Sequence, residues 1–336
     1  MGWIRRFAAV GVATVASLPG AVRLWAGDPR PSSTVPGAGS RPSAIPMPTL
    51  GGKQFWADEL FFHQWRIQRN VYTEHCRLLD ADDYRHASGS YEHCLAVLEE
   101  IKVRRKLPPM RGRAVIVLHG LAHSREGMAG LAQYLKEQGG YQEVFNVGYP
   151  STRLDIGEHA QALKHILEHL DGIEQVDFVA HSMGNIVIRH YLGDQAGRKP
   201  DGRLRRFVML GPPNHEAYLA SLVADNTLFQ LITGQPGQQL GRQWDRLQER
   251  LATPSFEFGI IAGGRGGPRG YNPLVPGDND GVVSVASTRL AGAADFAVLP
   301  ALHTFMMNDA KVQEYTLRFL QHGYFVSPEQ KQPIAK

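Results

Sequence analysis

The sequence of 336 residues lacks metal-binding motifs and has few cysteines, and outside its N-terminus it has almost no net charge. It contains 14 histidines but no HExxH motif and no Cys/His zinc spacing, so we expect no metal and no cofactor. Residues 1–53 carry six basic residues and one acidic residue, whereas the rest carries 30 basic and 31 acidic residues. The pI near 9.0 therefore originates at the N-terminus, and nothing predicts binding to nucleic acid.

Long apolar runs are also scarce, and the one near the N-terminus spans only residues 7–22. It is shorter than a typical membrane-spanning helix and contains Pro19. It follows Arg5 and Arg6 and precedes small residues, which is the arrangement of an export signal. We therefore expect residues 1–26 to be an export signal or membrane anchor, with the protein exported or held at a membrane by its N-terminus. A cytosolic protein with an apolar N-terminus is the alternative.

The two cysteines, Cys76 and Cys94, have no spacing that suits a metal. If the protein is exported, we expect them to form a disulfide that joins two helices. In a reducing compartment they would be buried thiols.

Two segments precede the main domain. Residues 27–52 predict an extended linker, because Pro, Gly and Ser make up 15 of these 26 residues. Residues 54–103 predict a helical N-terminal extension, because large apolar side chains recur there at roughly helical spacing. These side chains are Trp56, Leu60, Phe61, Trp65, Val71, Tyr72, Tyr91, Leu95, Leu98 and Ile101.

Residues 110–326 alternate between predicted strands and predicted helices. Apolar runs of strand length occur at 114–118, 144–147, 176–179, 206–210, 256–262 and 296–299. Helical patterns lie between them, at 125–138 and 155–170 among others. This order predicts an α/β domain with a doubly wound, mostly parallel sheet, whose ligand site lies at the carboxyl ends of the strands.

Residues 212–255 interrupt this alternation and predict a helical cap insertion. The insertion contains apolar segments at 218–223 and 228–232 and a charged helix near 244–251. Such a cap would line an acyl pocket and exclude water, or its helices would simply bury one another.

The main domain is organised around Ser182, in the segment Ala180-His181-Ser182-Met183-Gly184. The segment follows a predicted strand and precedes an apolar helix. A serine at a sharp strand-to-helix turn, with small residues two before and two after, forms a nucleophile elbow. A serine that only caps the helix is the alternative.

A nucleophilic serine needs a base and a carboxylate that orients the base. After the cap, the histidines are His303, which follows a predicted strand, and His322, at the end of a predicted helix. We therefore expect His303 to be the base. Asp280 in the turn before Gly281 is the expected carboxylate, with Asp278 as the reserve, although either aspartate could brace the turn instead.

The oxyanion of an acyl-transfer intermediate needs two N–H donors. The expected donors are the backbone N–H groups of Met183, directly after the serine, and of Leu121, directly after His119-Gly120. We expect His119 and His181 to brace their loops rather than to transfer protons.

These motifs together resemble the bacterial lipase and esterase branch of the α/β-hydrolases over residues 113–322. The matching segments are His119-Gly120-Leu121, Ala180–Gly184, Gly211–His215, Asn279-Asp280-Gly281 and His303. The resemblance implies a triad of Ser182, Asp280 and His303. The chain departs from the family in having Glu216 after Asn214-His215, where glycine is usual. It also has Phe305 where some relatives place a calcium-binding aspartate, so no calcium site is expected.

The sequence thus predicts a serine hydrolase of carboxylic esters that works through an acyl-enzyme on a small-molecule or lipid ester. Thioesterase, amidase and acyltransferase activities remain open, because one fold supports many chemistries. A non-catalytic envelope protein that uses the fold for binding is the rival from another class.

Overall fold

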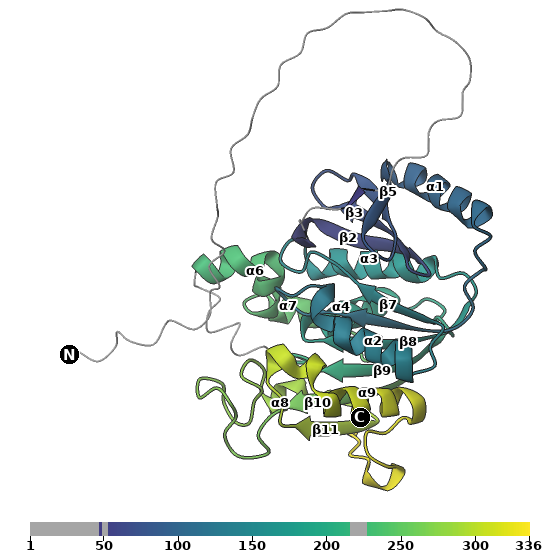
Figure 1. Ribbon diagram of the computed structural model, residues 1–336. Coiled ribbons are helices and arrows are strands. Elements are labelled where there is room, and N and C mark those ends of the chain that lie inside the picture. The colour runs from purple at the N-terminus through teal and green to yellow at the C-terminus, as the bar shows by residue number, and fades with distance from the viewer. Residues whose placement is uncertain (1–46, 49–52, 216–226) are drawn as a thin grey trace, which may run out of the picture. The chain divides into compact units, whose positions relative to one another are not determined.

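The computed structural model describes residues 47–48, 53–215 and 227–336 (Figure 1). Its central sheet has six strands in the order β11-β10-β9-β8-β6-β7, and all neighbouring pairs are parallel. The chain runs from β6 outward to β7, returns to β8, and continues outward to β11, so the sheet is doubly wound as predicted. The strands are β6 (Gly112–Leu118), β7 (Glu143–Val147), β8 (Ile173–His181), β9 (Leu204–Leu210), β10 (Glu257–Gly263) and β11 (Asp295–Leu299).

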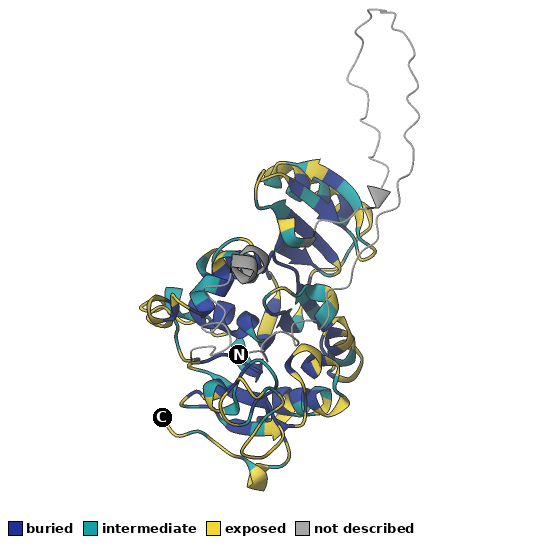
Figure 2. Ribbon diagram, turned by 90° about the vertical axis from the view of Figure 1, so that its left-hand side faces the viewer, coloured by how far each residue is buried: buried dark blue, intermediate teal, exposed yellow. Residues whose placement is uncertain are grey.

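Helices cover both faces of this sheet, and its strands are largely buried between them (Figure 2). Phe178 and Val179 are neighbours in β8 and are both fully buried, each in a different one of the two apolar clusters. Phe178 shares its cluster with residues of α3 and α4, and Val179 shares its cluster with residues of α2 and α9. The helices are η2 (Arg125–Met128), α2 (Ala129–Gln138), α3 (Ile156–Glu168), α4 (Met183–Asp194), α8 (Val285–Thr288), η3 (His303–Asn308), α9 (Ala310–His322) and η4 (Pro328–Gln330).

The helical extension predicted for residues 54–103 is wrong for most of that segment. A second sheet lies there, with five antiparallel strands in the order β1-β5-β4-β3-β2. The short helix η1 (Lys53–Phe55) lies between β1 and β2 in the chain. The helical prediction is confirmed for α1 (Tyr91–Arg104). The strands are β1 (Met47–Pro48), β2 (Trp56–Phe62), β3 (Trp65–Asn70), β4 (Cys76–Leu79) and β5 (Tyr84–Gly89).

The prediction failed because β2 is buried on both of its faces. Phe61 faces the central sheet, where its ring centroid lies 5.2 Å from that of Phe145 in β7. The next residue, Phe62, lies under the ammonium group of Lys102 in α1, 4.0 Å from the ring centroid. A strand covered on both faces does not show the alternation of apolar and polar residues that identifies a half-buried strand. In β2 the buried Asp58 and the half-buried Glu59 also interrupt the continuous apolar run that such a strand otherwise shows.

The predicted disulfide is also wrong. Cys76 lies in β4 and Cys94 in α1, and both are free thiols with no exposed surface. The two helices that the disulfide was expected to join are a strand and a helix. Burial raises the pKa of Cys94 to about 12 and also raises that of Cys76, so both side chains stay protonated near neutral pH.

The described part of the predicted cap is helical, with α6 (Thr227–Leu240) and α7 (Trp244–Gln248). Helix α6 breaks at Gly234, where φ is +61° and a Cβ atom would lie 2.1 Å from the carbonyl oxygen of Thr152. Gln239 then accepts a hydrogen bond of 2.8 Å from the N–H of Ile156, at the start of α3. These contacts hold the second half of α6 against the loop that follows β7.

Several sequence predictions fall outside the described residues. They are the export segment at 1–26, all of the linker at 27–52 except residues 47–48, and the apolar cap segment at 218–223. In the part of the chain that the structure describes, no helix is both long enough and apolar enough to span a bilayer.

Candidate functional site

Ser182 lies at a strained turn between β8 and α4. Its φ of 52° and ψ of −123° are unusual for a residue with a side chain, and a hydrogen bond of 2.9 Å from its N–H to Leu210 O helps to hold them. A Cβ atom on Gly184 would lie 2.7 Å from the carbonyl oxygen of His119, so the turn leaves room there only for glycine. Ala180 is fully buried and takes the place of the more usual first glycine. The elbow predicted from the sequence is present.

Asn185 also holds this turn, and sequence reasoning missed it. Its side-chain amide donates to the carbonyl oxygens of Ser182, at 2.8 Å, and Leu210, at 3.3 Å. Asn185 is fully buried and follows the serine by three residues on the same face of the helix. This spacing is the sequence signal that could have identified it.

The structure brings Ser182, Asp280 and His303 into one hydrogen-bonded chain. Nε2 of His303 lies 3.0 Å from Oγ of Ser182, and Nδ1 of His303 lies 2.6 Å from Oδ2 of Asp280. His303 and Asp280 are both buried. The three residues follow β8, β10 and β11 along the chain, and the sheet brings their loops together.

The turn at 278–283 separates the two candidate carboxylates. Asp280 uses Oδ1 to accept the N–H groups of Val282 at 3.0 Å and Val283 at 2.7 Å, which leaves Oδ2 for His303. The carbonyl oxygen of Asp280 also accepts the N–H of His303 at 2.9 Å. Asp278 instead accepts backbone N–H groups, among them those of Arg265 at 2.7 Å and Gly266 at 2.8 Å. Asp278 therefore braces the turn and does not contact the histidine.

His322 does not join this cluster. It is the last residue of α9, and its exposed ring stacks on Tyr324 with centroids 5.5 Å apart.

The loop after β6 lies against Ser182. A Cβ atom on Gly120 would lie 2.9 Å from Cβ of Ser182, so only glycine allows this approach. The next N–H in the chain belongs to Leu121, and Met183 provides the first N–H of α4. The first N–H groups of a helix have no partner within the helix and carry a partial positive charge. The two predicted oxyanion donors thus belong to segments that meet at Ser182.

His119 is a buried support of that loop. Its Nδ1 donates to the carbonyl oxygen of Gly120 at 2.9 Å, and its ring stacks on Tyr149 with centroids 4.2 Å apart. The Tyr149 hydroxyl donates to the carbonyl oxygen of His119. Burial lowers the pKa of His119 to about 4, so the ring is neutral near pH 7.

His181 supports His303 in a similar way. It is fully buried, and its Nε2 donates to the carbonyl oxygen of His303 at 3.0 Å. Burial, followed by the nearby His303 and His123, lowers its pKa well below the ordinary value. The ring of His181 therefore holds His303 in place as a neutral donor.

A third buried histidine, His159 in α3, gives the protein a testable pH dependence. Burial lowers its pKa to about 3, and neither ring nitrogen has a partner among the described residues. In the unfolded chain His159 binds a proton below about pH 6.5, whereas in the folded chain it stays neutral down to about pH 3. The free energy of unfolding is therefore at its full value above about pH 6.5 and falls as the pH drops toward 3. Between pH 8 and pH 5 the wild type should therefore lose about 2 kcal/mol more of its free energy of unfolding than His159→Leu loses.

Urea unfolding of the wild type and His159→Leu at pH 8 and pH 5 measures this difference. His75→Leu, which replaces an exposed histidine, serves as the control and should keep the wild-type pH dependence. An unchanged pH dependence in His159→Leu would contradict the prediction.

Metal ligands do not gather in the described residues, which contain no group of three His, Cys, Asp or Glu side chains able to hold an ion.

The chain is similar to solved structures of lipases, at low sequence identity. The mature lipase BlEst2 of Bacillus licheniformis is 20% identical, covers 64% of this chain and 91% of its own, and has a TM-score of 0.44. Lipase B of Aspergillus fumigatus is 13% identical, with coverages of 65% and 55% and a TM-score of 0.48. The monoacylglycerol lipase of Paleococcus ferrophilus is 14% identical, with coverages of 62% and 91% and a TM-score of 0.43. No family model and no curated protein matches the chain.

The fold rests on the chain's own topology. Six parallel strands in this order, with a strained serine turn at the carboxyl end of β8, have the arrangement of an α/β-hydrolase. The protein therefore has an α/β-hydrolase fold, as the sequence predicted.

Proposed function

We propose that the protein is a serine hydrolase of carboxylic esters and that it works through an acyl-enzyme. The observation that carries this proposal is the chain of contacts from Asp280 through His303 to Ser182, at 2.6 and 3.0 Å. A serine hydroxyl becomes a good nucleophile when a base in hydrogen-bond reach takes its proton.

In the proposed reaction, Nε2 of His303 takes the Ser182 proton as Oγ attacks the ester carbonyl. Asp280 stabilises the imidazolium that forms, and the N–H groups of Leu121 and Met183 stabilise the oxyanion. His303 then protonates the departing alcohol, which leaves an acyl group on Ser182. A water molecule gives its proton to His303 and attacks the acyl group, which releases the acid and restores the serine.

The proposed substrate class is a small-molecule or lipid ester. The helical insertion between β9 and β10 supports an acyl substrate, because it follows the carboxyl end of a strand next to the site. Thioesters, amides and acyl transfer to another alcohol would use the same serine chemistry. We also propose that residues 1–26 direct export or anchor the protein to a membrane, which the mass of the mature N-terminus tests.

Nitrophenyl esters of increasing acyl length test the proposed activity. The wild type should release a burst of nitrophenol of about one equivalent per chain with any ester whose deacylation is slow. Ser182→Ala should give no burst, and Ser327→Ala, which changes the partly buried serine directly before η4, should give the wild-type burst. Equal inactivity of the wild type and Ser182→Ala over the whole series would favour a binding protein.

A further inference from the structure

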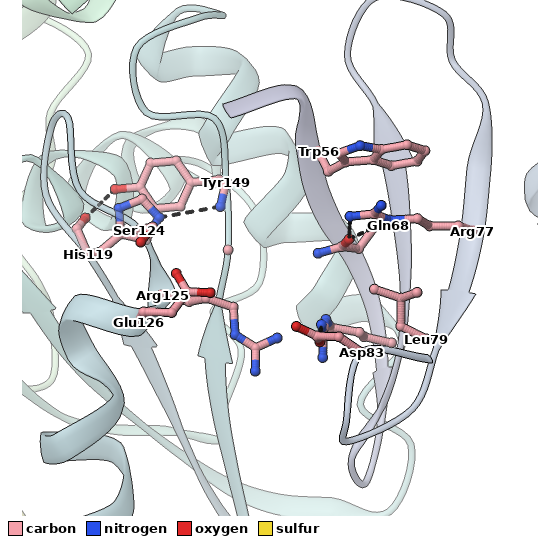
Figure 3. Close-up of a pocket in the computed structure, with 12 residues that line it drawn as sticks. Trp56, Gln68, Arg77, Leu79, Asp83, His119, Ser124, Arg125, Glu126 and Tyr149 are labelled. Carbon is pink, nitrogen blue, oxygen red and sulfur yellow. Dashed lines mark hydrogen bonds and ion pairs between the residues drawn. The ribbon is translucent and has the colours of Figure 1, made fainter. Parts of the chain in front are cut away.

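A small cavity lies behind the loop that contains His119, between the two sheets. It has a volume of about 100 Å³. His119 and Tyr149 line one side, and strands β2 to β4 line the other, with the side chain of Arg125 between them (Figure 3). Asp58 in β2 joins the two sides, because its N–H donates to Gly148 O at 2.9 Å and its Oδ2 accepts the N–H of Gly148 at 2.6 Å.

Three arginines from different segments converge on this cavity. They are Arg66 in β3, Arg77 in β4 and Arg125 in η2. The Arg77 guanidinium lies 3.9 Å from the ring centroid of Trp56 and donates twice to Oε1 of Gln68, at 2.9 and 2.7 Å. It is thereby fixed in place at the wall of the cavity.

Two nitrogens of this cluster lack hydrogen-bond acceptors. Nε of Arg66 and Nη1 of Arg125 are shielded from solvent and have no acceptor among the described residues. Arg66 is only 3% exposed, and the nearest carboxylate oxygen to its Nε, Oδ1 of Asp58, is 3.5 Å away. A buried guanidinium N–H without an acceptor is costly, so each such group needs an explanation.

The carboxylates around the cavity do not fill this need. Asp58 already accepts Gln68 Nε2 at 2.6 Å and the N–H of Gly148. Asp83 pairs with Nη2 of Arg66, but its side chain is 49% exposed. Burial lowers the pKa of Arg66 to about 10, and repulsion by Arg125 contributes to this shift. Burial also lowers the pKa of Arg77 to about 10, and repulsion by Arg66 contributes. An anion between the guanidinium groups would relieve this repulsion.

We propose that this cavity binds a tetrahedral oxyanion, with inorganic phosphate as its simplest ligand. Its volume accommodates a group of a few heavy atoms. Arginine offers planar, paired donors that match phosphate oxygens, and the anion would complete the unpaired groups of Arg66 and Arg125. Because His119 and Tyr149 form the opposite wall, a bound anion would also stiffen the loop that reaches Ser182.

Calorimetric titration with inorganic phosphate, at constant ionic strength, tests the proposal. Ser182→Ala protein is used, so that the result does not depend on the proposed hydrolase activity. One phosphate per chain should bind, and saturation should raise the melting temperature by linkage. Arg77→Gln and Arg125→Gln should each weaken binding at least about tenfold, because each removes a charged hydrogen-bond donor. Arg104→Gln, at an exposed position in α1, should bind as the parent does.

Three outcomes would overturn the proposal. They are the absence of binding heat in the parent protein, an equal rise in melting temperature with sodium chloride, and unchanged affinity in both pocket variants. Arg77 and Arg125 are both partly exposed, so these variants should fold, and circular dichroism checks that they do. Glycerol phosphate as a second ligand shows whether the site also accepts a phosphate monoester or only the free anion; either result supports an oxyanion site.

Discussion

Replacing Asp280 by Asn should lower kcat for ester hydrolysis about 10⁴-fold while leaving the fold intact. Oδ1 of the asparagine can still accept the N–H groups of Val282 and Val283. Its amide nitrogen, however, is a donor and cannot accept the Nδ1 proton of His303. Nδ1 must therefore act as the acceptor. The ring then carries its proton on Nε2, where it faces Ser182 and cannot take the serine proton.

Asp278→Asn is a matched control two residues away. That side chain accepts only backbone N–H groups of its own loop region, so the change removes about one hydrogen bond, worth about 1 kcal/mol of stability, and should leave kcat near the wild-type value. Steady-state kinetics with a nitrophenyl ester, together with melting curves, separates the two variants. Equal losses of kcat in both would refute the assignment of Asp280 as the orienting carboxylate.

Asp177→Ala should cost about 3–5 kcal/mol of folding stability, because it leaves the buried Tyr141 hydroxyl and the partly buried guanidinium groups of Arg113 and Arg205 without their acceptor. Asp177 lies in β8 and is 1% exposed. It accepts the Tyr141 hydroxyl at 2.6 Å and the Arg205 guanidinium at 2.6 and 3.0 Å. It also accepts the backbone N–H of Arg206 at 3.0 Å and pairs with Arg113 at 3.3 Å. Removal of the carboxylate therefore takes the acceptor from one hydroxyl, one backbone N–H and two guanidinium groups.

Denaturant unfolding measures this loss. Glu174→Ala removes an exposed carboxylate from the same strand and should change stability by less than about 0.5 kcal/mol. At a temperature where Asp177→Ala is still folded, its kcat should match the wild type, since none of these partners contacts Ser182 or His303. A loss of stability no larger than that of Glu174→Ala would show that the buried network contributes little.

The central sheet could be predicted because its strands leave a plain signal in the sequence. The inner strands are buried on both faces, so they appear as continuous apolar runs, such as 114–118, which is fully or almost fully buried. The helices between them carry amphipathic patterns, and the order of elements then determines a parallel sheet. The N-terminal sheet gave no such signal, because the contacts that bury Phe61 and Phe62 come from β7 and α1, which lie elsewhere in the chain.

The candidate site could be predicted in part. Ser182 and His303 are identifiable because each lies shortly after a strand and fits a chemical role. The choice between Asp278 and Asp280 depends on which carboxylate points at the histidine, and spacing along a turn does not determine this. The arginine cavity was not predicted, because Arg66, Arg77 and Arg125 are brought together only by the contact between two sheets.

The order of the site residues along the chain has a consequence for synthesis. Ser182 and His303 are separated by 121 residues, and the loops that hold Ser182, Asp280 and His303 follow three different strands of one sheet. A growing chain that has folded only as far as β9 holds a strained serine but neither His303 nor Asp280. The proposed reactivity toward esters would therefore be withheld until β11 and its following loop have joined the sheet. The time at which activity appears during translation would therefore report when folding of the domain is complete.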